Sequence, residues 1–108
     1  KSMENTERVE ETLAYSIGGP AMLEQCAEEC NELAKAALKL ARKIRDENPT
    51  PLSYETIVQN LEEEIADVRL CIDSVMSVFG IDEDNISRIE EYKKSRWHER
   101  LDYKRNKN

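Results

Sequence analysis

The chain has 108 residues and a formal net charge of −7, with 39% hydrophobic, 36% charged and 6% aromatic residues. This length allows one domain with a modest core, and the low aromatic content without alternating apolar runs argues against a β-sandwich. The acidic balance argues against nucleic-acid binding, and no apolar run reaches membrane-spanning length. We therefore expect one all-α domain over residues 1–108 that completes its core by oligomerising.

The cysteines and the single histidine limit the chemistry further. Cys26, Cys30 and Cys71 form an odd set without CxxC spacing, which argues against a zinc site or a disulfide framework. Three reduced thiols suit a cytoplasmic protein, and their places on or near apolar stripes predict that they are buried. His98 has no visible partner in the sequence, so we expect it on the surface.

Four helices are predicted in chain order, and the first two meet at a pair of glycines. A short helix over about 4–16 should stop at Gly18-Gly19. The next should open after Pro20, a residue favoured in a first turn, and continue to about Glu47. Asn48-Pro49-Thr50-Pro51 then predicts a stiff connection. Lys1 and Ser2, which precede Met3, are interpreted as left over from expression.

The last two helices have clearer end signals. Ser53 is a suitable N-cap for a helix that runs to about Phe79, and Gly80 is suited to end it. The fourth helix should start near Asp82 or Asp84 and reach about Tyr103, with residues 104–108 frayed.

Both long central helices carry an apolar stripe with steps of three and four residues. The first stripe is Leu23, Cys26, Cys30, Leu33, Ala37, Leu40 and Ile44, and the second is Leu61, Ile65, Val68, Ile72, Val75 and Phe79. A shift of 35 residues carries the first stripe from Cys26 onward onto the second. The sequence therefore predicts that these helices form a central antiparallel hairpin.

The same shift relates two pairs of acids. It carries Glu29 onto Glu64 and Glu32 onto Asp67. At about 100° per residue these four carboxylates lie on equivalent flanks of the two stripes, which an antiparallel pair brings to one side. Residue 48, where the predicted turn falls, is the midpoint in sequence between Glu29 and Asp67 and also between Glu32 and Glu64. A symmetric hairpin would therefore set the two members of each pair opposite each other. We therefore expect the four carboxylates to converge.

Four converging carboxylates would repel one another, and a hard divalent cation removes that repulsion. Oxygen ligands suit Mg²⁺ or Mn²⁺, and carboxylates from facing helices are a known way to build metal sites in bundles. The alternative is that these residues are ordinary surface acids in a chain with 23 of them. Glu28 and Glu63 lie about 160° from the stripes and are expected to face solvent.

The strings Glu28-Glu29-Cys30-Asn31-Glu32 and Glu64-Ile65-Ala66-Asp67 resemble the EExxE and ExxD signature of MazG-like nucleoside triphosphate pyrophosphohydrolases. The resemblance extends over about residues 23–101. It implies a four-helix MazG-like bundle, completed as a homodimer or homotetramer.

The resemblance also implies an Mg²⁺-dependent enzyme that cleaves a nucleoside triphosphate between the α and β phosphates, giving a monophosphate and pyrophosphate. Glu29, Glu32, Glu64 and Asp67 match the metal ligands of that family. Bound metal would make a water more acidic, and Glu29 or Glu32 could accept its proton. A non-catalytic helical module that uses the same acids for a partner or for metal alone is the alternative.

The C-terminal segment is basic, since seven basic and two acidic residues follow from Lys93 onward. Lys93, Arg96 and Arg100 fall within about 60° of one another on the predicted helix. The resemblance implies that such residues contact the phosphates, and a solvated basic face is the alternative. Trp97 and Tyr54 are candidates for stacking on a base, although packing is the more common role of such residues.

Overall fold

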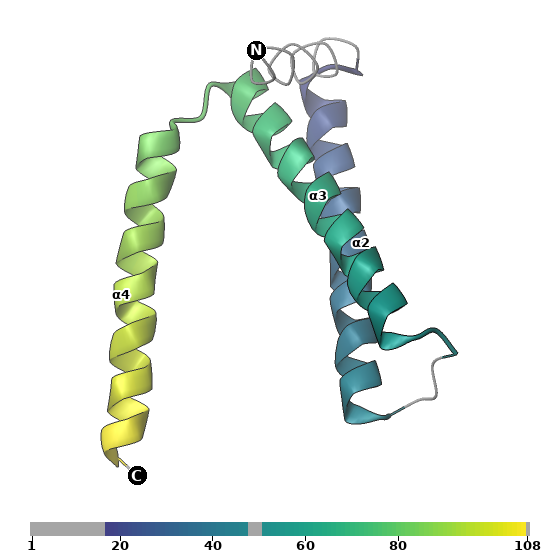
Figure 1. The fold of residues 1–108 in the computed structure, drawn as a ribbon. Helices are drawn as coiled ribbons and strands as arrows, with labels where there is room; N and C mark the ends of the chain where they lie inside the picture. The colour runs from purple at the N-terminus through teal and green to yellow at the C-terminus, as the bar shows by residue number, and fades with distance from the viewer. Residues whose placement is uncertain (1–16, 48–50, 108) are drawn as a thin grey trace, which may run out of the picture.

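The computed structural model describes residues 17–47 and 51–107 of the chain. These residues form three helices and no strand: α2 (Gly19–Arg45), α3 (Tyr54–Phe79) and α4 (Glu83–Lys107), shown in Figure 1. The expected all-α class is therefore confirmed for this part of the chain, while the helix predicted over 4–16 lies outside it. Within the same ranges, no helix combines the length and the apolar character needed to cross a membrane.

The ends of α2 follow from backbone conformation more than from side-chain capping. Gly18 has a φ of 81°, a value that L side chains rarely adopt, and Pro20 stands in the first turn as predicted. At the other end Asp46 is left-handed, with a φ of 55°, and its N–H donates to the carbonyl of Lys43 at 3.3 Å. This turn ends α2 two residues before the predicted Glu47, because a left-handed residue cannot continue a right-handed helix.

Side chains set the start of α3 and of α4. The Ser53 hydroxyl accepts a hydrogen bond from the Thr56 N–H at 3.2 Å, which confirms Ser53 as the N-cap. Gly80, with a φ of 60°, ends α3 as predicted. The Asp82 carboxylate accepts from the N–H of Asp84 at 3.0 Å and so caps α4. Helix α4 ends at Lys107, four residues beyond the predicted end near Tyr103.

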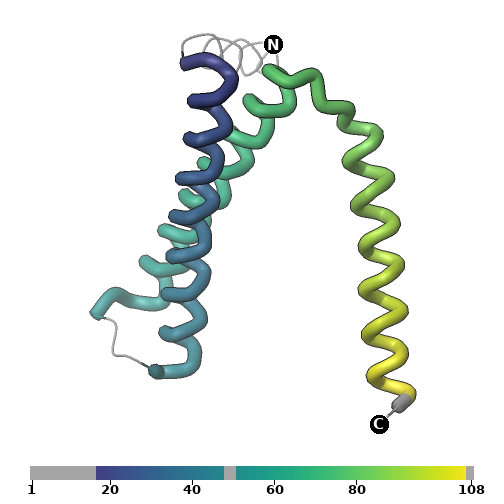
Figure 2. The backbone as a smooth tube through the Cα atoms, turned by 180° about the vertical axis from the view of Figure 1, so that it is seen from behind, coloured from purple at the N-terminus to yellow at the C-terminus, as the bar shows by residue number. Residues whose placement is uncertain are grey.

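Helices α2 and α3 lie side by side, and α3 returns along α2 in the opposite direction (Figures 1 and 2). The start of α2 is close to the end of α3: a Cβ on Gly19 would lie 3.1 Å from Cζ of Phe79. A side chain at Gly19 would therefore require the exposed ring of Phe79 to move by a few tenths of an ångström.

The contact between the two helices is made by a narrower set of residues than the predicted stripes. The buried and half-buried residues along it include Met22, Cys26, Glu29, Leu33, Ala36 and Leu40 on α2, and Ile57, Leu61, Glu64, Val68, Cys71 and Val75 on α3; Ser74 of α3 is buried too. The 35-residue relation holds between these two sets as well. The contact face is nevertheless turned by roughly 50° from the predicted stripes, about half a residue step.

This rotation corrects part of the predicted core. Leu23, Ile44, Ile65, Ile72 and Phe79, which the stripes assign to the interior, are exposed. Glu29 and Glu64, which the pattern places beside the stripes, lie in the contact face instead. A stripe wider than 100° allows two helices to meet along either edge, and this pair meets along the edge that carries the acids.

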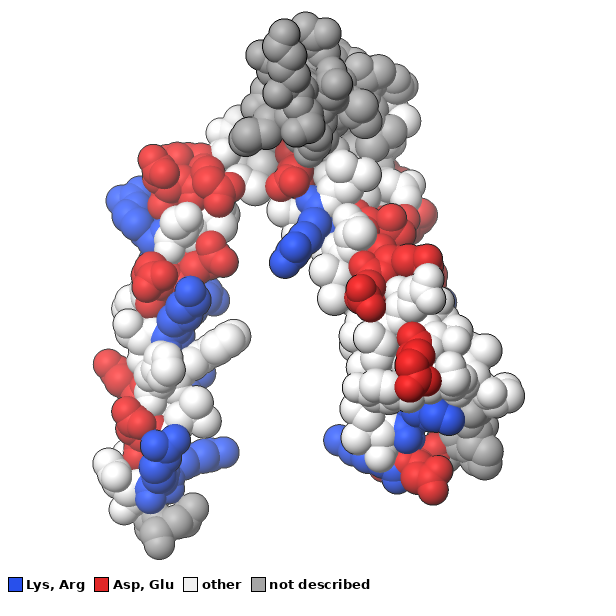
Figure 3. Space-filling view, viewed as in Figure 1, with Lys and Arg blue, Asp and Glu red and all other residues white. Residues whose placement is uncertain are grey.

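Helix α4 stands apart from the other two. The α2–α3 pair is the only pair of described helices in extensive contact, and the space-filling view shows open space between it and α4 (Figure 3). The radius of gyration is 18.1 Å, whereas a compact protein of this length has one of about 13 Å. A single copy of the described chain thus leaves α4 without a surface to rest on.

Candidate metal centre

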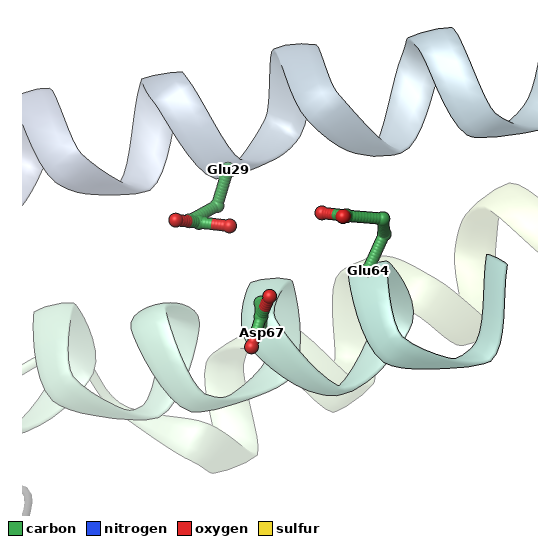
Figure 4. A group of neighbouring side chains, drawn as sticks. All are labelled: Glu29, Glu64 and Asp67. Atoms are coloured by element: carbon green, nitrogen blue, oxygen red, sulfur yellow. The ribbon is translucent and has the colours of Figure 1, made fainter. Parts of the chain in front are cut away.

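Three carboxylates meet between α2 and α3, about midway along the pair. One oxygen from each of Glu29, Glu64 and Asp67 lies within 4.8 Å of the other two (Figure 4). Glu29 reaches down from α2, while Glu64 and Asp67, one turn apart on α3, reach toward it. The i, i+3 spacing on α3 brings its two carboxylates to one side of that helix.

Glu64 is half-buried, and one of its two carboxylate oxygens is enclosed. Its Oε2 is buried and has no hydrogen-bond partner, the only such side-chain oxygen or nitrogen among the described residues. A buried carboxylate oxygen without a partner is unfavourable, because nothing replaces the water that it has lost. Within the described residues no lysine or arginine pairs with Glu29, Glu64 or Asp67.

The electrostatic consequence is a raised pKa at Glu64, above the ordinary carboxyl value of 4.5. Burial is the first cause, and the negative charges of Asp67 and Glu29 are the next. Glu32 and Glu63 contribute in the same direction. No positively charged side chain from the flanking sequence offsets these carboxylates, because no Lys or Arg occurs within residues 20–34 or 54–68. A cation placed among the three carboxylates would remove this penalty.

Gln25 is a site residue that the sequence analysis did not single out. Its side-chain Nε2 donates to Oε1 of Glu29 at 2.9 Å, from one turn earlier on α2. The bond fixes one oxygen of Glu29 and leaves the other free to face α3. The signal was present in the i, i+4 spacing, which brings two side chains together on a helix surface.

The fourth predicted ligand, Glu32, does not join the group. Its side chain is 53% exposed, and its Oε1 lies 3.6 Å from Nζ of Lys35 in an i, i+3 pair. Glu32 is still close enough to raise the pKa of Glu64 through its charge. It therefore lies beside the cluster, not within it. Glu28 and Glu63 are exposed, as expected.

The three cysteines lie along the same pair of helices, with different exposures. Cys71 is buried and Cys26 half-buried, but Cys30 is exposed, so the prediction that it is buried is wrong. Burial raises the pKa of Cys26 and of Cys71, and neighbouring groups add to the effect. Both thiols therefore stay protonated at neutral pH and are poor nucleophiles and poor metal ligands.

The predicted phosphate contacts are all on α4. Lys93, Arg96 and Arg100 are exposed, and the guanidinium of Arg96 lies 5.8 Å from the ring centre of Tyr92. Because α4 stands apart from the α2–α3 pair, one copy of the chain does not bring these residues to the carboxylates. Their role stays a prediction. Trp97 and His98 are also exposed.

No protein-family model, no curated protein and no solved structure matches this chain. What can be said of its function therefore depends on its own residues. Carboxylate oxygens are the ligands that Mg²⁺ and Mn²⁺ prefer, so the chemistry that this arrangement favours is the binding of a hard divalent cation.

We predict that Glu64→Gln stabilises the protein at pH 7 in the presence of a chelator. The pKa of Glu64 is higher in the folded chain than in the unfolded chain, so the folded state holds more protons between the two values. Wild-type stability therefore rises as pH falls through the folded pKa, and is lost as pH rises through it. The glutamine variant lacks this penalty. Melting temperatures measured between pH 4 and pH 8 will show its advantage shrinking as pH falls.

Glu63→Gln provides the control, because it removes the same charge from an exposed neighbour. Its effect should be smaller, because this carboxylate is exposed and contributes least among the four neighbouring charges that raise the pKa of Glu64. A glutamine at 64 that destabilises the metal-free protein at pH 7 would contradict the repulsion between these carboxylates.

Proposed function

We propose that this chain is an Mg²⁺-dependent nucleoside triphosphate pyrophosphohydrolase of the MazG-like kind, working in the cytoplasm as a homo-oligomer. The observation that carries the proposal is the convergence of Glu29, Glu64 and Asp67 around a buried carboxylate oxygen without a partner. Its second support is the resemblance of the strings containing these residues to the EExxE and ExxD signature.

The residues present fit a hard divalent cation. All three converging side chains offer oxygen, which Mg²⁺ and Mn²⁺ prefer, and none offers the nitrogen or sulfur that favours zinc. The unpartnered oxygen of Glu64 is the donor most in need of a positive charge. When bound, the metal would neutralise the phosphates, orient them and make a coordinated water more acidic. Mn²⁺ is expected to substitute for Mg²⁺.

Gln25 and Glu32 are assigned roles beside the three proposed metal ligands. Gln25 holds Glu29 through its 2.9 Å hydrogen bond, so that the carboxylate keeps one orientation. Glu32 lies beside the cluster with an exposed carboxylate. We assign to that carboxylate the acceptance of a proton from the attacking water, because it has a free oxygen within reach of solvent and is not one of the three converging ligands.

The basic residues of α4 are assigned to the triphosphate. Lys93, Arg96 and Arg100 can offer positive charge and, for arginine, paired N–H donors that suit phosphate oxygens. In the proposed oligomer, Glu29, Glu64 and Asp67 would hold the metal, and Lys93, Arg96 and Arg100 would hold the phosphates. This arrangement requires α4 to approach an α2–α3 pair, because the two stand apart in a single copy.

The test is direct. Purified protein is incubated with Mg²⁺ and each ribo- and deoxyribonucleoside triphosphate in turn, and pyrophosphate and nucleoside monophosphate are quantified by ion-exchange chromatography. We expect equal amounts of the two products from at least one substrate, and none after addition of a chelator. Cleavage between the β and γ phosphates would instead release orthophosphate.

The alternative is a non-catalytic module that uses the same acids for metal alone or for a partner. Folded protein whose melting temperature rises with Mg²⁺ or Mn²⁺, but which releases no pyrophosphate from any of the substrates, would favour that alternative. If folded protein shows neither a metal response nor any product, the enzyme and the metal-binding module are both refuted.

A further inference from the structure

The three cysteines form a row that runs from the surface into the contact between α2 and α3. Cys30 is exposed, Cys26 is half-buried, and Cys71 is buried, at 7% exposure. Cys26 and Cys30 are one turn apart on α2, and a side-chain hydrogen bond joins their thiols. One end of the row is therefore open to reagents in solution, while the other end lies between the two helices.

Cys71 lies across the contact from Cys26, at the same height along the pair. The close approach of Gly19 to Phe79 fixes one end of the pair. Cys26 comes seven residues after Gly19, and Cys71 comes eight residues before Phe79. Measured from the carboxylate cluster, Cys26 is three residues before its member on α2, and Cys71 is four residues after its nearer member on α3. In an antiparallel pair these matched steps set the two cysteines opposite each other.

Both side chains belong to the contact face. Cys26 is one turn from the fully buried Met22, and Cys71 is one turn from the buried Val68. Burial first, and then the neighbouring thiol of Cys26, raises the pKa of Cys71. Packed helices have axes 8–10 Å apart and Cα atoms about 2.3 Å from each axis, so facing Cα atoms are roughly 3.5–5.5 Å apart. Residues close to that line fall within the range of about 4.4–6.8 Å that a disulfide spans between Cα atoms.

The spacing within α2 is less suitable for a lasting disulfide. The Cβ atoms of an i, i+4 pair on a helix are about 5–6 Å apart, whereas those of a disulfide are about 3.5–4.5 Å apart. A bond between Cys26 and Cys30 would therefore distort α2, and a strained disulfide is exchanged more easily. A bond between Cys26 and Cys71 leaves both helices in their own geometry, so it is the more stable product.

We propose that Cys26 and Cys71 form a reversible disulfide across the α2–α3 contact, and that Cys30 is the thiol through which the oxidant enters. The oxidant is a small disulfide of the glutathione class. The thiolate of Cys30 attacks one sulfur of oxidised glutathione and breaks its S–S bond. This step leaves a mixed disulfide on Cys30 and releases one glutathione thiolate, which takes up a proton.

Two exchanges within the protein complete the reaction. The thiolate of Cys26 attacks the sulfur of Cys30 and releases the second glutathione. The thiolate of Cys71 then attacks the sulfur of Cys26, and Cys30 leaves and becomes a thiol again. Overall, two protein thiols lose two electrons and two protons, and one oxidised glutathione gains them as two reduced glutathiones. An excess of reduced thiol drives the same steps backward.

The disulfide would act as a brace beside the carboxylate cluster. It closes the loop between residues 26 and 71 and so restricts the unfolded chain, which stabilises the folded one. The brace stands one turn from the three carboxylates, whose charges repel one another when no metal is bound. The proposal depends on the placement of the three thiols, and it stands whether or not the protein hydrolyses nucleotides.

The experiment is oxidation of the full chain by oxidised glutathione at about pH 8, with a chelator present, followed by alkylation of the remaining thiols in urea. Trypsin and a glutamate-specific protease then release the three cysteines on separate peptides, because Glu28 and Glu29 lie between Cys26 and Cys30. Mass spectrometry without reduction should find Cys26 linked to Cys71, and Cys30 alkylated. A final product with glutathione on Cys30 alone, or with Cys26 linked to Cys30, would overturn the proposal.

The unfolded chain is the matched control. In urea, the short loop between Cys26 and Cys30 closes more readily than the long loop to Cys71. The same oxidation should therefore shift the product toward the Cys26–Cys30 pair. If the folded and unfolded chains give the same products in the same proportions, the α2–α3 contact does not select the disulfide and the proposal fails.

Cys30→Ser tests the entry of the oxidant. It keeps both cysteines of the proposed disulfide and should slow their linkage at least about tenfold, because neither is as accessible as Cys30. Cys71→Ser should instead retain glutathione on Cys30 or stop at the strained Cys26–Cys30 bond. Linkage in Cys30→Ser at the wild-type rate would refute the role of Cys30.

Thermal melting tests the brace independently of the chemistry of its formation. In the presence of a chelator, oxidised wild type should melt at least about 5 °C above reduced wild type, and dithiothreitol should remove the difference. Cys71→Ser treated in the same way should show no such rise. A protein that carries the Cys26–Cys71 bond but melts no higher than the reduced form would refute the brace.

Discussion

Asp67→Asn should abolish the rise in melting temperature that Mg²⁺ or Mn²⁺ produces, and should lower pyrophosphate release at least ~100-fold. Asp67 is one of three converging carboxylates, and an amide oxygen in its place removes a full negative charge from the cluster. Changes to residues that only support a ligand already cost about 10–100-fold in metal affinity, so the loss of a ligand should cost no less. At a metal concentration about 100 times the dissociation constant, this removes most of a stabilisation of about 2.7 kcal/mol.

Three further variants test whether the metal response belongs to the cluster of Glu29, Glu64 and Asp67. Glu28→Gln makes the same charge change beside Glu29 on an exposed carboxylate and should leave both readouts close to wild type. Gln25→Ala should weaken the metal response by an intermediate factor, because it frees Glu29 without removing it. Glu32→Gln should lower turnover while keeping the metal response. If Asp67→Asn and Glu28→Gln behave alike, the carboxylate cluster is not the metal site.

Ile57→Ala should lower the free energy of unfolding by about 2–4 kcal/mol, the usual cost of truncating a fully buried aliphatic side chain. Ile57 is 1% exposed and lies one turn inside the start of α3. Its loss leaves a cavity at the end of the contact face, where Met22, at the far end of α2, cannot collapse to fill it. Urea unfolding followed by circular dichroism measures the change, at one protein concentration because association shifts apparent stability.

Leu38→Ala is the comparison for this prediction. Leu38 is a large aliphatic residue at 59% exposure, and its truncation should change the free energy of unfolding by no more than about 0.5 kcal/mol. A loss at Leu38 equal to that at Ile57 would contradict the contact face described above. Neither substitution touches the carboxylates, so the metal response per folded molecule should survive in both.

Most of the helix ends were predictable from the sequence, because their causes are local. Gly18, Ser53 and Gly80 act through their own backbone angles or through a hydrogen bond three residues away. The early end of α2 at Asp46 was missed for a related reason. Aspartate adopts the left-handed conformation only in some contexts, so its presence is a weaker stop signal than glycine.

Much of the site was also predictable. The 35-residue relation between α2 and α3 depends on periodicity alone, and it brought Glu29, Glu64 and Asp67 to the same side of the pair. The sequence could not show that Glu32 turns to Lys35, because an exposed carboxylate has several partners within reach and they differ little in free energy. Nor could it show that Oε2 of Glu64 is enclosed without a partner.

Local signals in the sequence are thus enough to predict that the described residues are helical, where most of the helices begin and end, and which acids come together. They do not predict which edge of each broad apolar stripe forms the contact between α2 and α3, nor which apolar residues stay exposed as a result. Periodicity defines a face to within tens of degrees, whereas the fit of side chains such as Met22 and Ile57 selects one edge. Helix α4 stands apart from the α2–α3 pair, and its own apolar face is interrupted by Lys93 and Arg100.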